Sequence, residues 1–173
     1  MFSSRHIEVV RSSSKNDCGP CAVAMVLGAF EGKRVTAREA AREMRFWRVP
    51  GIGATLPRGI TSTLRRHGLK TAGGWFGRIQ DIKAHVDADH PVIVLTRPTD
   101  LPHAPFFSLH YRVVVGYNDN AAASGGGELY FSCSASPPEV EEHPGNLALS
   151  YAQFRRQWLT WVSINWYVAA YPR

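Results

Sequence analysis

The sequence contains few cysteines and lacks long apolar runs. Its three cysteines among 173 residues are too few for a disulfide scaffold, and their odd number leaves at least one thiol unpaired. The N-terminal stretch MFSSRHIEVVRSSSK lacks the apolar segment of a secretory signal peptide. The longest apolar runs, such as Val92–Leu95, are far too short to span a bilayer. We therefore expect a cytoplasmic protein with reduced thiols and no membrane insertion.

The sequence also lacks internal repeats, domain linkers and recognisable nucleic-acid-binding motifs. Apolar residues make up 45% and charged residues 20%, which is typical of a soluble globular protein. The net charge is +6, but the basic residues are scattered. They fall in Arg34–Arg48, Arg58–Lys70 and Arg155–Arg156. We predict a single domain over residues 1–173 with a solvated basic surface and no nucleic-acid partner.

The first half of the chain predicts helices. Nearly every position from Cys18 to Phe30 is small or apolar, so this helix should be buried on all sides. Thr36 and Glu39 have the spacing of a capping box at the start of a second helix. The expected helices are Cys18–Phe30, Thr36–Arg45, Pro57–His67 and Ile79–Ala88.

The second half predicts mainly strands. Short β-branched or alternating runs occur there, and one more lies near the N-terminus. The expected strands are Ile7–Val10, Pro91–Thr96, Leu109–Tyr117, Glu128–Cys133 and Ile164–Ala170, with one further helix at Tyr151–Trp158. Helices followed by strands indicate an α+β fold, in which an antiparallel sheet packs on helices.

The stretch NDCGPCAVAMVLGAF, residues 16–30, places Cys18 at the start of the buried helix. Unpaired N–H groups and the helix dipole stabilise a thiolate there. Gly19 lets a substrate backbone come close. Cys18 is therefore a candidate nucleophile, and a nucleophile of this kind needs a base beside it.

His110 is the best candidate for that base among the seven histidines. It stands near the start of the predicted strand LHYRVVVGY, residues 109–117. This strand can pack against the buried helix and direct His110 at the helix N-terminus. A single histidine on a strand is more often structural, but the order of cysteine, helix start and histidine favours a catalytic pair.

These residues carry a resemblance to a known family. Asp17-Cys18-Gly19-Pro20 and the apolar residues after it resemble the nucleophile helix of the C39 and C39-like peptidases, which are papain-fold cysteine peptidases of bacteria. The stretch HYRVVVGY from His110 resembles their histidine strand. Weaker similarities lie at Pro57–Leu69, His90–Leu95 and Tyr151–Trp158, so the likeness covers nearly the whole chain. It implies a papain-like fold with a central helix against a twisted antiparallel sheet.

The resemblance also implies a mechanism. Cys18 would attack a carbonyl of a peptide or leader peptide, and His110 would take the thiol proton and later return it. An acyl-enzyme would form and be resolved by water or by another nucleophile. The backbone N–H of Cys18 would help to hold the oxyanion. Phe106 and Phe107, in the loop before the histidine strand, are expected with Gly19 to contact the substrate.

Two family features are not found. A glutamine that donates to the oxyanion usually precedes the cysteine, but Ser12–Ser14 stand in that region. The Ser12 hydroxyl or the Asn16 amide is the available substitute. A third catalytic residue, Asp or Asn, usually follows the strand after the histidine strand, but Phe131–Pro137 has no carboxylate.

Asn118 and Asp119 are therefore the remaining candidates for orienting the His110 ring, although both are also typical turn residues. These departures leave a second hypothesis open. The chain would then be a catalytically impaired peptide-binding domain that has kept its Cys and His.

Two other uses of the cysteines are less favoured. Cys18-Gly19-Pro20-Cys21 matches a thioredoxin-type CxxC, but that motif follows a strand in a βαβ unit, and here it follows a serine-rich loop. A metal site of Cys18, Cys133 and His110 matches no common zinc spacing. We expect Cys21 and Cys133 to be buried thiols, and we predict no metal or cofactor. The sequence predicts no oligomeric state.

Overall fold

A computed structural model describes residues 1, 5, 7–11, 16–31, 35–99, 108–121, 126–136, 145–161 and 163–173. Its helices are α1 (Cys18–Glu31), α2 (Ala37–Glu43), α3 (Pro57–Arg66), α4 (Ile79–Asp87) and α5 (Tyr151–Trp158), with a 3₁₀ turn η1 (Arg45–Trp47). Its strands are β1 (Lys70–Gly74), β2 (Val92–Thr96), β3 (His110–Asn118), β4 (Glu128–Ser132), β5 (Leu147–Ser150) and β6 (Tyr167–Tyr171).

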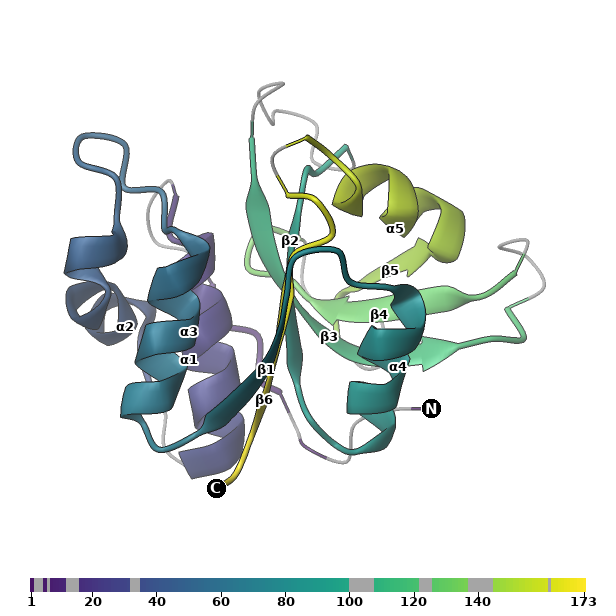
Figure 1. Cartoon of the computed structure of the whole chain (residues 1–173), viewed down its shortest axis with the longest axis horizontal. Coiled ribbons are helices and arrows are strands. Elements are labelled where there is room, and N and C mark those ends of the chain that lie inside the picture. The colour runs from purple at the N-terminus through teal and green to yellow at the C-terminus, as the bar shows by residue number, and fades with distance from the viewer. Residues whose placement is uncertain are drawn as a thin grey trace.

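The strands form one sheet in the order β1-β6-β2-β3-β4-β5. Every neighbouring pair is antiparallel. Helices α1, α2 and α3 lie on one side of the sheet and α4 and α5 on the other (Figure 1). This mixture of helices and antiparallel sheet confirms the predicted α+β class.

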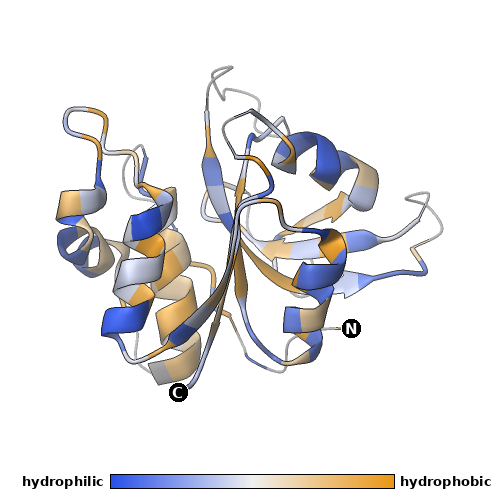
Figure 2. Cartoon of the chain, viewed as in Figure 1, coloured by the Kyte–Doolittle hydropathy of each residue, from blue (hydrophilic) through white to orange (hydrophobic). Residues whose placement is uncertain are grey.

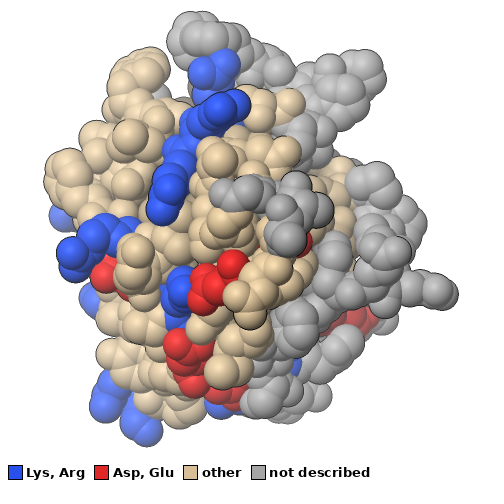
Figure 3. All heavy atoms as spheres, turned by 90° about the vertical axis from the view of Figure 1, so that its right-hand side faces the viewer, with Lys and Arg blue, Asp and Glu red and all other residues tan. Residues whose placement is uncertain are grey.

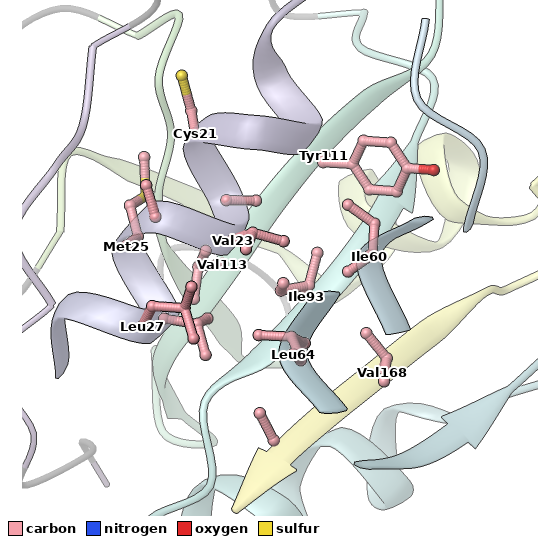
Figure 4. Packing of buried hydrophobic residues seen from close by; sticks show 14 of the residues in the cluster. Cys21, Val23, Met25, Leu27, Ile60, Leu64, Ile93, Tyr111, Val113 and Val168 are labelled. Atoms are coloured by element: carbon pink, nitrogen blue, oxygen red, sulfur yellow. The ribbon is translucent and has the colours of Figure 1, made fainter. Parts of the chain in front are cut away.

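Helix α1 is the centre of the larger core. Its residues from Cys21 to Leu27 are each at most 3% exposed, and its ribbon is among the most hydrophobic in the molecule (Figure 2). Side chains from α3 and the sheet meet α1 in one apolar cluster, which includes Ile60, Leu64 and Val113 (Figure 4). Burial of this much apolar surface fixes α1 against β3, and so fixes where α1 begins.

The predicted helices are confirmed, with shifts of a few residues at their ends. The capping box at α2 is present, because the Thr36 backbone N–H donates to Glu39 Oε2 at 2.8 Å and the Glu39 N–H donates to Thr36 Oγ1 at 3.2 Å. Ile60 and Leu64 share the buried face of α3.

The strand predictions need several corrections. Residues 7–10 form no strand, whereas β1 and β5 were not predicted. Strand β6 begins at Tyr167, because Ile164 and Asn165 turn the chain with φ angles of 36° and 53°. Asn118 ends β3 instead of forming the turn, and its Oδ1 accepts a hydrogen bond from the Asn120 N–H at 3.0 Å.

No helix in the described part of the chain is long and apolar enough to cross a membrane. On the face that carries α4 and α5, the Lys and Arg side chains are interspersed with uncharged surface and with Asp and Glu (Figure 3).

Candidate active site

Cys18 is the first residue of α1 and is half-buried. The first turn of the helix is closed by a hydrogen bond from the Cys21 N–H to the Asp17 carbonyl at 2.8 Å. The backbone amides of Gly19 and Tyr111 form hydrogen bonds with the Cys18 sulfur. These amides point partial positive charge at the sulfur, which favours a thiolate.

His110 is the first residue of β3, at the end of the sheet where α1 begins. It is 8% exposed, and its ring shares a side-chain hydrogen bond with Cys18. Its Nε2 lies 3.3 Å from the sulfur of Cys133. With Nε2 beside Cys133, we assign Nδ1, the other ring nitrogen, to the hydrogen bond with Cys18. The imidazole thus lies between two thiols.

The charges of the three groups depend on one another. Burial opposes ionisation of Cys18, but the hydrogen bond and positive charge of His110 prevail and lower the Cys18 pKa below its usual value. Burial opposes the imidazolium, but hydrogen bonds with Cys133 and Cys18 raise the pKa of His110 to about 9. Near neutral pH the site therefore favours an imidazolium beside thiolate sulfur.

A loop between η1 and α3 packs against the start of α1. Arg48 Nη2 lies 2.7 Å from Asp17 Oδ1, and the Asn16 side-chain amide donates to the Ile52 carbonyl at 2.7 Å. The Tyr111 hydroxyl donates to the Thr55 carbonyl at 2.9 Å. Residues 48–55 are thus held beside Cys18 by contacts with the two residues that precede α1 and with β3.

A groove of about 720 Å³ begins next to this loop. Leu56 and Trp166 are among its lining residues. Leu56 follows Thr55, which contacts Gly19, and the Trp166 ring meets the edge of Tyr111 at 5.8 Å between centroids. The full lining is Trp47, Leu56, Pro57, Arg58, Thr61, Ser62, Arg65, Arg66, Trp75 and Trp166. The groove offers apolar and aromatic surface with basic side chains next to the loop that packs against Gly19, although Cys18 and His110 are not among its lining residues.

Asn118 and Asp119 do not reach His110. They lie at the opposite end of β3, where Asp119 contacts Lys83 Nζ at 2.6 Å and the Tyr151 hydroxyl at 2.6 Å. The hydrogen bond from Lys83 lowers the pKa of Asp119. Neither residue can orient the His110 ring from that position, and Asp119 instead ties α4 to α5.

The three oxyanion candidates differ in where the structure places them. The Cys18 amide lies at the helix start, while the Asn16 side chain is engaged with the Ile52 carbonyl. Ser12, the third oxyanion candidate, lies outside the described residues, and so do Phe106 and Phe107, which were expected to contact the substrate.

From the sequence, Cys133 was grouped with Cys18 and His110 only as a less favoured metal site, and its contact with the His110 ring was not predicted. Cys133 follows β4 directly and is fully buried. A signal was present in the sequence, since Cys133 lies in the stretch where the family usually places its third catalytic residue. A thiol at that position is not the carboxylate or amide that the family pattern leads one to expect.

The other thiol, Cys21, is fully buried, and burial raises its pKa to about 12. Cys18, Cys21 and Cys133 are all free thiols. Residues 7–11 form no strand, so the described chain has no strand leading into the CxxC as a thioredoxin-type site requires. Within the described ranges, no three His, Cys, Asp or Glu side chains are grouped to hold a metal ion.

Comparison with known sequences decides the family. The profile of the Peptidase_C39 like family matches residues 5–160. The chain belongs to this family. The resemblance inferred from the sequence motifs is thereby confirmed.

Solved structures of C39 peptidases share the fold. A C39-like peptidase from Bacillus anthracis has a TM-score of 0.71 at 13% identity, covering 99% of this chain and 98% of its own. The peptidase domain of Streptococcus ComA, a bifunctional ABC transporter involved in quorum sensing, has a TM-score of 0.66 at 17% identity, covering 97% and 100%. A double glycine motif protease from an AMS/PCAT transporter, in complex with its leader peptide, has a TM-score of 0.62 at 14% identity, covering 99% and 97%.

A papain-like enzyme also has a similar fold. Digestive procathepsin L 3 of Tenebrio molitor has a TM-score of 0.56 at 14% identity, covering 99% of this C39-like chain and 72% of its own. A search of functionally curated protein sequences finds no match. The fold prediction is therefore confirmed at the level of the C39 and papain-like peptidases.

Proposed function

We propose that this C39-like protein is a cysteine peptidase that processes a peptide through a Cys18–His110 pair and an acyl-enzyme. The observation that carries the proposal is the hydrogen bond between Cys18 and His110 at the N-terminus of α1. A lowered Cys18 pKa and a raised His110 pKa are what a thiolate nucleophile paired with an imidazolium requires.

The chemistry follows from the two protonation states. The Cys18 thiolate adds to the carbonyl carbon of the scissile bond, and the oxygen takes the negative charge. The imidazolium then gives its proton to the leaving amine, the C–N bond breaks and a thioester remains on Cys18. Neutral His110 next removes a proton from water, whose oxygen attacks the thioester and releases the acid. An amine in place of water would give acyl transfer.

The Cys18 backbone N–H is our proposed oxyanion donor. It belongs to the first turn of α1, whose leading amides have no partner within the helix. The positive end of the helix dipole stabilises an oxyanion at the same place.

The proposed substrate is a peptide segment such as a leader peptide. The groove beside Leu56 and Trp166 is lined by apolar and aromatic side chains and by three arginines. The positive charges of Arg58, Arg65 and Arg66 would attract acidic side chains of a bound peptide. One structural neighbour is a double glycine motif protease solved with its leader peptide. A free thiolate nucleophile is also suited to a reducing compartment, which supports peptide processing in the cytoplasm.

Cleavage of a peptide library, read by mass spectrometry, tests this proposal. The library should contain leader-type peptides with a pair of small residues, and the chain should be assayed as parent, Cys18→Ser, His110→Ala and Cys21→Ser. We expect cleavage by the parent and by Cys21→Ser, and its loss in Cys18→Ser and His110→Ala. Cleavage that persists in Cys18→Ser would overturn the proposal.

Peptide binding measured on the same library addresses the impaired-enzyme alternative. Peptides that bind the parent and are never cut would favour a binding domain over a peptidase.

A further inference from the structure

Cys133 occupies the side of the His110 ring that Cys18 does not use. Its sulfur lies 3.3 Å from Nε2, and both side chains are buried. A buried imidazole nitrogen without a partner would be costly, so this contact completes the hydrogen bonding of the ring. The acyl-enzyme chemistry of Cys18 and His110 leaves Cys133 without a role.

We propose that Cys133 is a positioning residue that accepts the Nε2–H of His110 as a thiolate, in the place where related peptidases use a carboxylate or amide. This inference rests on the Cys18–His110 pair of the proposed function. It replaces the Asn118 and Asp119 candidates with a residue that contacts the ring.

The direction of this hydrogen bond decides what His110 can do. If the Cys133 thiol donated to Nε2, then neutral His110 would carry its proton on Nδ1, which faces Cys18, and could not accept the Cys18 proton. If Nε2–H donates to Cys133, Nδ1 is the basic nitrogen. Cys133 thereby selects the tautomer that activates Cys18.

The charges around Cys133 favour the thiolate. Burial opposes its ionisation, but the hydrogen bond and charge of His110, the charge of Arg112 and a hydrogen bond from Ser136 lower the pKa of Cys133 to about 6. Val113 pairs with Ser132 across β3 and β4, so one step further along the ladder brings Arg112 beside Cys133. Arg112 is fully buried and donates to Gln157 Oε1 at 2.7 Å.

The backbone of Cys133 is held on both sides by one side chain. Its N–H donates to Asn146 Oδ1 at 2.8 Å, and its carbonyl accepts from Asn146 Nδ2 at 2.8 Å. Asn146 is itself buried. Two such bonds fix where the sulfur sits relative to Nε2, as a positioning residue requires.

The test is the pH dependence of iodoacetamide alkylation at Cys18, with each cysteine read separately by mass spectrometry. Cys133→Ser keeps a small acceptor but removes the charge, so the alkylation midpoint of Cys18 should rise by about one pH unit. Cys133→Asp restores the charge and should bring the midpoint back toward that of the parent. Cys21→Ser is the matched control, because Cys21 is equally buried and should leave the midpoint unchanged.

If the pH profile of Cys18 alkylation in Cys133→Ser coincides with that of the parent, the proposed role of Cys133 is overturned.

A second measurement covers the case in which Cys133 variants do not fold. In Cys18→Ser, the ultraviolet absorbance of thiolate should rise with a midpoint near 6, the pKa of Cys133. Cys21 does not interfere, since its pKa is about 12. A midpoint at the ordinary thiol pKa of about 8.5 or above would overturn the proposal.

Both measurements are independent of peptide cleavage. A chain that shows the Cys133-dependent shift but cuts no peptide would contradict the proposed function and support the role of Cys133. If the parent cuts peptides but Cys133→Ser has the parental pH profile of Cys18 alkylation, the proposed function would be supported and the role of Cys133 contradicted.

Discussion

Gly19 and Thr55 are in such close contact that no side chain fits between them. A β-carbon added at Gly19 would come within 2.7 Å of the Thr55 β-carbon and 2.8 Å of Thr55 Oγ1. The residue after the proposed nucleophile is thus packed directly against the loop of residues 48–55. This loop and the start of α1 form one structural unit.

Gly19→Ala is expected to push the loop of residues 48–55 away from the start of α1. Relief of the overlap must displace either α1 or the loop, at a cost of about 1–3 kcal/mol in the free energy of unfolding. The same displacement moves the Gly19 amide away from the Cys18 sulfur and should slow Cys18 alkylation at acidic pH. Urea denaturation and alkylation kinetics measure the two effects, and parental values for both would show that the contact is unimportant.

We expect the ion pair of Arg48 with Asp17 to contribute more to the free energy of unfolding than the ion pair of Lys83 with Asp119. The side chains of the first pair are 17% and 14% exposed, and those of the second are 24% and 50% exposed. Arg48→Met removes this ion pair from a largely buried carboxylate and should cost about 1–3 kcal/mol in the free energy of unfolding. Lys83→Met, as the matched control, should cost under about 1 kcal/mol. Equal losses in urea denaturation would contradict this order.

Asn146→Ala should affect both stability and the site. It leaves the buried Cys133 N–H and carbonyl without the two bonds from Asn146, at a cost of about 1–3 kcal/mol. Because Cys133 is then free to shift, the alkylation midpoint of Cys18 should rise, as in Cys133→Ser. A variant that loses stability but keeps the parental midpoint would show that Asn146 has a structural role alone.

The stability conferred by His110 is expected to depend on pH. Its pKa is raised to about 9, so its contribution is complete below about 6.5 and is lost as the pH rises through about 9. The pKa of Cys133 is lowered to about 6, so its contribution is lost as the pH falls through about 6. Charged together, the groups stabilise the fold between about pH 6 and 9.

The difference in unfolding free energy between the parent and His110→Ala should therefore peak in that window and shrink on both sides. Urea denaturation over a pH series measures it. A difference that stays constant with pH would point to packing instead of charge.

The helices could be predicted because their signals are local. The apolar run of α1 and the Thr36–Glu39 capping box lie within a few turns of chain. Strand β1 was missed because Gly73 and Gly74, with φ angles of 115° and 159°, are atypical of strands. Gly73 is required there, since a β-carbon would come within 2.7 Å of the Tyr167 carbonyl oxygen.

The site was only partly predictable, because some of its contacts depend on register. Cys18 and His110 could be found from motifs, whereas the contact of His110 with Cys133 spans 23 positions and depends on how β3 pairs with β4. Asp119 is nearer to His110 in sequence. Nine positions along an extended strand, however, place it about 30 Å away.

The rate of Cys18 alkylation against pH, in the parent and in His110→Ala, shows whether Cys18 and His110 form a thiolate–imidazolium pair. Fast modification of Cys18 near pH 6 that is lost in His110→Ala would show a thiolate held by the imidazolium, well below the ordinary thiol pKa of about 8.5. Slow modification of the parent that becomes faster only near that ordinary pKa, and is the same in His110→Ala, would show that no such pair exists.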